Sequence, residues 1–189
     1  MTIIGALMGF LLLSGAMSAL PAQASPVRNQ ISNGASAPTL PNYAVTLTAY
    51  NAVPEQTDGD PLVTASGSFS NPEVVAARSR DLAEELPFGT IIEIAGPSTP
   101  NNNCGYGIVE PIVGYRVIAD TMNARYTSRI DILFNTKSNY IMPNGSVKNA
   151  GMILGICNGS SIRVVGHVDI TRPNRLPKTQ KELAGLVTL

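Results

Sequence analysis

Two aspartates in the stretch YRVIADTMNARYTSRIDILF, residues 115–134, stand where they could carry out acid–base chemistry. Asp120 ends a predicted strand, whereas Asp131 lies among apolar residues inside a second predicted strand. Ionising a carboxylate in apolar surroundings is costly, so burial raises its pKa. Two acids in unlike environments suit the acid–base cleavage of a glycosidic bond. The alternative is structural, with one acid capping a turn and the other making a satisfied contact in the core.

The elements that would position these acids are mostly short strands. Alternating or β-branched apolar runs predict strands, and clusters of glycine, proline and asparagine predict the turns between them. Helical propensity predicts about two turns of helix over residues 80–86, and a capping-box pattern at Thr179 predicts a short helix in the tail. Little helix and many turns indicate a small closed or sandwiched β domain. The expected strands cover residues 44–50, 62–67, 74–77, 91–96, 108–113, 115–119, 129–134 and 161–170.

The N-terminal region has the pattern of an export signal. Residues 1–24 carry no charge, and an apolar run ends at the small-x-small sequence Ala-Gln-Ala. This pattern predicts a signal peptide over residues 1–24, or an uncleaved anchor. We expect residues 25–41 to be a flexible linker, residues 42–171 to be the β domain and residues 172–189 to be a tail with a possible short helix. The protein is therefore expected to be exported, and to be periplasmic, associated with the cell wall or extracellular.

Charge and metal-ligand content narrow the classes of partner. The 13 basic and 13 acidic residues balance, which gives no electrostatic reason to expect nucleic acid or an anionic membrane surface as a partner. His167 is the single histidine, so we expect no zinc site, and no cofactor is expected. Cys104 and Cys157 could pair in an oxidising compartment or remain as two buried thiols, and the sequence leaves both open.

Six short blocks follow one another between residues 46 and 134. They are TLTAY (46–50), TASG (64–67), RD (80–81), LPFGT (86–90), ADTMNAR (119–125) and RIDILF (129–134). In order and spacing they resemble the 3D domain, which is named for its three aspartates and occurs in bacterial cell-wall proteins such as membrane-bound lytic transglycosylase A. A weaker likeness continues through residue 168. The resemblance implies a six-stranded double-psi β-barrel that cleaves the glycan strands of peptidoglycan.

The resemblance also implies roles for the three aspartates. Asp131 takes the position of the acid/base, and Asp120 takes that of a supporting carboxylate. Asp81 falls in a block more often tied to structure, and its distance to the following proline is one residue longer than in many members. The insertion over residues 138–149 and the loop that holds Cys104 depart from the compact family core.

The activity that the resemblance implies is that of a lytic transglycosylase. We also expect the protein to be a monomer. Asp131 would protonate the bond between N-acetylmuramic acid (MurNAc) and N-acetylglucosamine (GlcNAc), and then accept the proton of the C6 hydroxyl as a 1,6-anhydro ring closes. The alternative is a non-catalytic, expansin-like module that binds wall glycans, because a fold does not fix an activity. A binding module would be expected to carry an aromatic platform, whereas this chain has no tryptophan and 5% aromatic residues.

Several neighbours of the acids are candidate binding or supporting residues. Tyr50 could stack on a sugar ring, or could simply be half-buried in its strand. Thr64 could hydrogen-bond an acid or the substrate, or merely suit a strand. Arg125 could pair with either aspartate, grip a carboxylate on a peptide stem, or lie free on the surface. Asp58 and Asp60 are expected to be solvated acids of a turn.

Overall fold

The computed structural model describes residues 40–57, 59–99, 103–172 and 175–187. The expected signal over residues 1–24, most of the expected linker and Asp58 therefore lie outside the described residues. Within the part that is described, no helix has both the length and the apolar character needed to cross a bilayer.

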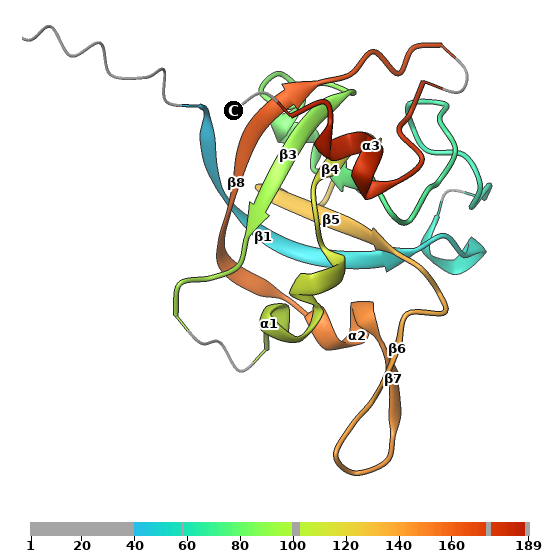
Figure 1. Ribbon diagram of the computed structural model, residues 1–189, viewed down its shortest axis with the longest axis vertical. Helices are drawn as coiled ribbons and strands as arrows, with labels where there is room; N and C mark the ends of the chain where they lie inside the picture. The colour runs from blue at the N-terminus through green and yellow to red at the C-terminus, as the bar shows by residue number, and fades with distance from the viewer. Residues whose placement is uncertain (1–39, 58, 100–102, 173–174, 188–189) are drawn as a thin grey trace, which may run out of the picture. The chain divides into compact units, whose positions relative to one another are not determined.

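Six strands close into a barrel (Figure 1). Their order around the barrel is β1-β5-β2-β4-β3-β8, in which β1 pairs with β5 and β2 pairs with β4 in parallel, and the other neighbours are antiparallel. The expected all-β, six-stranded double-psi β-barrel with long loops and little helix is thus confirmed. The barrel strands are β1 (Asn42–Asn51), β2 (Val75–Arg78), β3 (Thr90–Ala95), β4 (Arg116–Thr121), β5 (Arg129–Phe134) and β8 (Cys157–His167).

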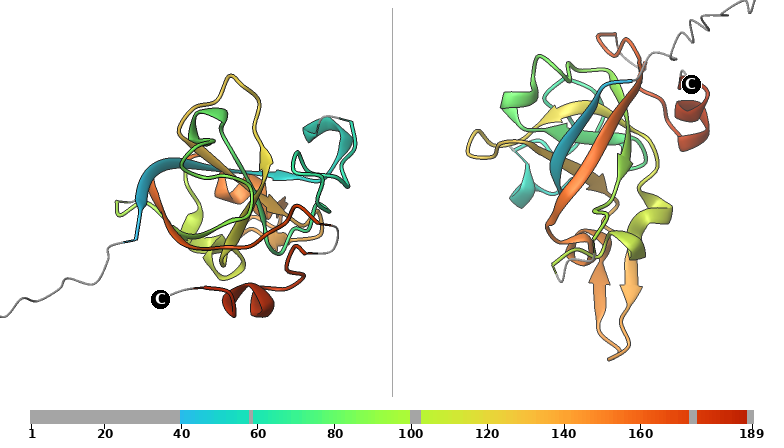
Figure 2. Two further views of the ribbon diagram at one scale, coloured as in Figure 1. Left: turned by 90° about the horizontal axis from the view of Figure 1, so that it is seen from above. Right: turned by 90° about the vertical axis from the view of Figure 1, so that its left-hand side faces the viewer.

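The remaining elements decorate the barrel. A hairpin of β6 (Asn139–Ile141) and β7 (Val147–Asn149) projects from the end of the barrel at which α1 (Tyr106–Val109) and α2 (Ala150–Leu154) lie (Figure 1 and Figure 2). The Asn-Gly pair at residues 144–145 forms its turn, as expected, with Gly145 at φ 79°. The tail contains α3 (Gln180–Ala184), and the short 3₁₀ helices are η1 (Pro54–Gln56), η2 (Arg80–Leu82) and η3 (Glu110–Ile112).

The expected strand over residues 108–113 is wrong, because this segment is helical. It contains the end of α1 and all of η3. Pro111 occupies the first turn of η3, where its missing N–H is not needed, whereas in a strand it would remove a ladder hydrogen bond. An apolar run of this length has no periodicity that separates a strand from a helical segment.

Two further expectations differ from the structure in extent. Residues 62–67 form turns with one isolated bridge, Val63 to Phe69, and Gly67 adopts φ 81°. The N–H groups of Thr64 and Gly67 bond within the loop, and those of residues 65 and 66 donate to β4 at single points, so no continuous ladder forms. The helix expected over residues 80–86 shortens to the single turn of η2. Pro87 disfavours the helical conformation of the residue before it, which limits the helix from its C-terminal side.

The strands are apolar on both faces, and each face packs into its own cluster. Neighbours on one strand alternate between the clusters, as Ala76 does with Val75 and Ala77 on β2. One cluster takes in buried residues of α1 and α2, and the other takes in Leu183 of α3. Burial on both faces fixes the register of the strands, because a slip by one residue would exchange the two sets of side chains.

A disulfide joins Cys104 to Cys157, which settles the alternative that the sequence left open. The Cα atoms are 4.7 Å apart, and the bond spans 53 positions of the sequence. It ties the loop before α1 to the first residue of β8, next to the isolated bridge between Cys104 and Gly155. The loop that holds Cys104 is therefore anchored to a barrel strand.

Replacing both cysteines, as Cys104→Ala with Cys157→Ala, should lower the free energy of unfolding by about 2 to 4 kcal/mol. The physical reason is that the cross-link restricts the unfolded chain across the long loop it closes. Thermal unfolding followed by circular dichroism measures the effect, and the reduced wild-type protein is the matched control. Equal melting temperatures for oxidised and reduced wild type would contradict a stabilising role.

Candidate active site

The order of the strands brings the two aspartates into one row. Ala77 on β2 pairs with Asp131 on β5 at one side and with Asp120 on β4 at the other. Two strand spacings separate the acids, or about 9 to 10 Å between their Cα atoms. Ala77, whose side chain is only a methyl group, occupies the position between them. The surface of the sheet is therefore unobstructed between the two carboxylates.

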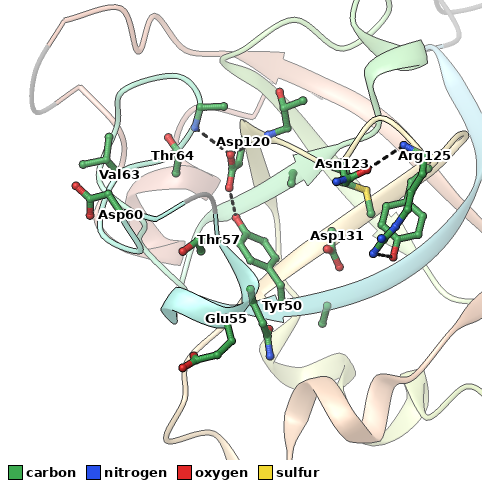
Figure 3. Close-up of a pocket in the computed structure, with 17 residues that line it drawn as sticks. Tyr50, Glu55, Thr57, Asp60, Val63, Thr64, Asp120, Asn123, Arg125 and Asp131 are labelled. Atoms are coloured by element: carbon green, nitrogen blue, oxygen red, sulfur yellow. Dashed lines mark hydrogen bonds between the residues drawn. The ribbon is translucent and has the colours of Figure 1, made fainter.

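The two carboxylates line one open cavity of about 760 Å³ (Figure 3). The cavity also brings in three of the other predicted residues, Tyr50, Thr64 and Arg125, but does not include Asp81. The remaining lining residues are Ala49, Glu55, Gln56, Thr57, Asp60, Val63, Ala65, Ala77, Thr121, Met122, Asn123 and Tyr126.

Asp120 accepts three hydrogen bonds. Its Oδ1 accepts from the backbone N–H groups of Ala65 at 2.9 Å and Thr121 at 2.8 Å, and its Oδ2 accepts from the Tyr50 hydroxyl at 2.7 Å. These three donors fix the position and orientation of the carboxyl group at one side of the cavity. Burial first, and the charge of Asp120 second, raise the pKa of Tyr50 well above its ordinary value, so the phenol stays a donor.

The Tyr50 side chain is therefore a partner of Asp120. It is 9% exposed, which is less than the half-buried strand tyrosine expected as the simpler alternative. A ring with so little exposed surface offers no face on which a sugar could stack. Figure 3 shows the ring reaching from β1 towards Asp120, with Asp131 on its other side.

Asp131 is the acid whose proton affinity is shifted. Its side chain is half-buried, and Oδ1 accepts a hydrogen bond of 2.7 Å from the Thr48 hydroxyl on β1. Burial is the main cause that raises the pKa of Asp131 to about 6, and the negative charge of Asp120 raises it further. The Thr48 hydrogen bond and the charge of Arg129 act in the opposite direction. A carboxyl group with this pKa can both give and take a proton near neutral pH.

Asp81 lies outside the cavity and fixes a turn. It is exposed, and its Oδ2 accepts the backbone N–H of Ser128 at 2.8 Å. Ser128 has φ 51°, an unfavourable conformation for a residue other than glycine, and it directly precedes β5. Hydrogen bonds, chiefly from Ser79, lower the pKa of Asp81. Asp81 thus holds the entry to the strand that carries Asp131.

Thr64 and Arg125 line the cavity without bonding to either acid. Thr64 Oγ1 lies 3.0 Å from Ser66 Oγ and donates to the Ser68 carbonyl oxygen at 3.1 Å. These bonds close the loop whose Ala65 N–H reaches Asp120. Arg125 is exposed, and its Nη2 donates to the Tyr126 hydroxyl at 2.8 Å. Of the alternatives for Arg125, pairing with an aspartate is therefore not observed.

The sequence reasoning missed Thr48 and the backbone donors to Asp120. Thr48 stands within the TLTAY block, but nothing in that block says that it faces Asp131. The pairing follows from the parallel register in which Thr48 lies opposite Asp131. The strand order was the missing information, because these residues are far apart in the chain.

Metal binding at this site has little support from the side chains. Glu55 and Asp60 join the two aspartates around the cavity. Among the residues that the structure describes, however, no three His, Cys, Asp or Glu side chains converge well enough to hold a metal ion.

Comparisons with known proteins add little to this geometry. No protein-family model matches the chain, and no curated protein matches it significantly. One solved structure that matches is a mutant of Clavibacter michiganensis expansin in complex with cellohexaose, with 14% sequence identity and a TM-score of 0.33. The match covers 66% of this chain and 50% of that chain, so it spans about half the length of the expansin. A likeness this weak carries no argument about function, and the resemblance to the 3D family stays a prediction.

Proposed function

We propose that this protein is a peptidoglycan lytic transglycosylase that cleaves the bond between MurNAc and GlcNAc and leaves 1,6-anhydro-MurNAc ends. The observation that supports this most directly is the state of Asp131. It is a half-buried acid with a pKa of about 6, and it opens into the same cavity as Asp120. Asp131 is the general acid and base, and Asp120 is the charge stabiliser.

In the first step Asp131 acts as an acid. Its proton passes to the glycosidic oxygen, the bond from C1 of MurNAc to that oxygen breaks, and GlcNAc leaves with a free hydroxyl at C4. Positive charge develops at C1 as this bond lengthens. The negative charge of Asp120, held by its three donors, stabilises that charge across the cavity.

In the second step Asp131 acts as a base. The C6 hydroxyl of the same MurNAc gives its proton to the ionised carboxyl group, and its oxygen forms the new bond to C1. The ring closes, Asp131 regains its proton, and no water is consumed. One acid/base therefore serves both steps, unlike hydrolysis, in which a second carboxylate activates water or attacks the sugar.

The test is to identify the ends that the protein produces. Purified protein is incubated with peptidoglycan, and soluble fragments are analysed by mass spectrometry. The proposal expects fragments lighter by one water than hydrolytic products. Fragments that carry the added water would make the protein a glycosidase. Binding to peptidoglycan with no fragments would instead indicate the expansin-like module considered from the sequence.

Tyr50→Phe should lower the rate of fragment release by about tenfold and leave the barrel folded. The variant removes one charge-assisted hydrogen bond to Asp120, and such bonds contribute about 1.5 to 3 kcal/mol. Without this bond the Asp120 carboxylate is less firmly positioned to stabilise the positive charge that develops at C1. Initial rates on soluble glycan strands measure the effect.

Tyr43→Phe is the matched control for this variant. Tyr43 lies on the same strand, packs against the other core cluster and does not line the cavity. Its hydroxyl can be removed without changing the surroundings of Asp120, so the rate should stay at the wild-type value. Equal rates for Tyr50→Phe and Tyr43→Phe would show that the phenol of Tyr50 does not support Asp120 during the reaction.

A further inference from the structure

Two arginines share one tyrosine ring at the edge of the cavity. The Cζ atoms of Arg125 and Arg129 lie 4.7 and 4.8 Å from the centroid of the Tyr126 ring. Arg125 and Tyr126 line the cavity, and Arg129 is the first residue of β5, two positions before Asp131. We refer to Arg125, Tyr126 and Arg129 as the basic end of the cavity.

Neither arginine of the basic end forms an ion pair among the described residues, where the ion pair observed is Arg163 with Glu93. Their shared contact with one ring places them within about 10 Å of each other, roughly one screening length at 0.1 M salt. Two like charges this close repel, and an anion between or beside them would relieve the repulsion. Arg125 directs one donor to the Tyr126 hydroxyl, so the rest of its planar fork is available to a carboxylate.

The basic end lies beside the proposed acid and away from the acidic side of the cavity. Arg129 and Asp131 stand two positions apart on β5, so their side chains leave the same face of the strand, and the charge of Arg129 lowers the pKa of Asp131. Figure 3 shows Arg125 on the Asp131 side, whereas Glu55 and Asp60 lie beyond Tyr50. The charges around the cavity are therefore unevenly distributed, with the positive charges of Arg125 and Arg129 on the side of Asp131, the proposed proton donor.

This polarity bears on a choice that the proposed reaction has to make. A peptidoglycan strand alternates two N-acetylated sugars, which differ in the lactyl group that MurNAc carries on O3. That group ends in a carboxylate, or in a peptide stem that itself bears carboxylates. Because the two sugars differ only in this substituent, a site that cuts after MurNAc and not after GlcNAc has to recognise it.

We propose that the basic end binds a carboxylate on the O3 substituent of MurNAc and thereby sets which of the two alternating bonds lies at Asp131. The inference rests on the proposed function, since it names the part of that substrate which the site reads. Arg125 contacts the carboxylate, and Arg129 adds its charge from its place against the same Tyr126 ring. The carboxylate belongs either to the lactyl group itself or to the peptide stem.

The experiment measures binding apart from cleavage. The Asp131→Asn protein is titrated by calorimetry with three ligands of equal length: glycan strands with peptide stems, strands whose stems an amidase has removed, and chitin oligosaccharides without carboxylates. We expect at least one of the first two to bind about tenfold more tightly than chitin at low salt. Adding Arg125→Gln should remove that difference, and adding Arg172→Gln, an exposed arginine outside the cavity, should not.

The pattern of affinities separates the two sources of the carboxylate. Preference for strands with stems assigns it to the stem, and preference for stripped strands assigns it to the lactyl group. Salt should weaken whichever preference is found, because the contact is exposed and ionic. Equal affinity for all three ligands, or a preference that survives Arg125→Gln, would overturn the proposal.

Kinetics of the otherwise wild-type protein keep this inference distinct from the proposed function. Arg125→Gln should raise KM on the preferred strands and change kcat little, because the carboxylate contact is made equally before and during the reaction. If the protein releases anhydro fragments but shows no carboxylate preference, the proposed activity stands and the proposed role of the basic end is wrong. If it shows the preference but releases no anhydro fragments, the basic end is part of a binding site and the proposed activity is wrong.

Discussion

The Asp131→Asn protein should release anhydro fragments at least about a thousandfold more slowly than the wild type, and should also resist unfolding better at pH 7. The loss of activity follows from removing the one group that gives and takes the proton, a contribution of about 10² to 10⁴ in rate before the second proton transfer is counted. The fold should be unaffected, because an asparagine Oδ1 can still accept the Thr48 hydroxyl.

The gain in stability follows from the pKa of Asp131. The folded protein raises this pKa from 3.8 to about 6, mainly by burial, so folding favours the neutral carboxyl group. The stability that the neutral group contributes is fully present below pH 3.8 and is lost as the pH rises to about 6. By pH 7 the loss amounts to about 3 kcal/mol. Asparagine stays neutral throughout, so the variant keeps what the wild type loses.

Unfolding by urea at pH 4 and at pH 7 measures this effect. The free energy of unfolding of Asp131→Asn should exceed that of the wild type at pH 7 and approach it at pH 4. Asp169→Asn is the control, since Asp169 is exposed, lies outside the cavity and has its pKa lowered by Thr171. The control should keep activity and gain no stability.

The pH dependence of the wild-type rate gives a second readout of the same group. Below pH 6 most of Asp131 carries its proton, and above it the protonated fraction falls about tenfold per pH unit. Fragment release should therefore decline on the alkaline side of pH 6. Undiminished activity of Asp131→Asn would show that Asp131 is not the acid and base of the reaction. A variant less stable than the wild type at pH 7 would show that burial does not raise the pKa of Asp131.

The burial of Asp131 could be predicted from its neighbours in the chain, because four apolar residues around one acid in a strand leave it few polar contacts. The strand itself and the strand expected over residues 115–119 followed from local composition and were found at β5 and β4. The shared row through Ala77 could not be predicted in the same way. It depends on β2 lying between β4 and β5, and such an order is set by packing between distant segments.

The misread segments show the same limit at smaller scale. Residues 108–113 are apolar enough for a strand, but Pro111 suits the first turn of a helix better than a strand. The disulfide at Cys104, which holds the preceding loop against β8, could not be assigned from the sequence. Arg125 lay in a recognisable block, but the contact that it and Arg129 make with the Tyr126 ring depends on the shape of the loop that joins β4 to β5. Local propensity fixes which residues prefer a strand, whereas side-chain partners depend on the completed fold.

Arg116→Met should destabilise the protein by more than about 4 kcal/mol and leave much of it unfolded at 37 °C. Arg116 is 1% exposed at the start of β4, and burial lowers its pKa to about 9, so it is still charged at neutral pH. Its guanidinium donates to the backbone carbonyl oxygens of five residues, and its Cζ lies 5.7 Å from the centroid of the Phe134 ring. The acceptors are Val113 at 2.6 Å, Pro72 at 2.7 Å, Ile112 at 2.8 Å, Leu133 at 3.1 Å and Val75 at 3.5 Å.

The large cost arises because methionine fills the space but leaves these carbonyl groups without a donor. Each unpaired buried acceptor costs about 1 to 3 kcal/mol, against a total stability of about 5 to 15 kcal/mol for a domain. Arg116→Lys keeps the charge without the planar fork and should fall between wild type and Arg116→Met. Arg163→Met is the control, since its ion pair with Glu93 is about 40% exposed and should contribute at most about 1 kcal/mol. Urea unfolding of all three variants decides the matter, and an Arg116→Met protein as stable as Arg163→Met would mean that these carbonyl groups find water or other donors when the guanidinium is removed.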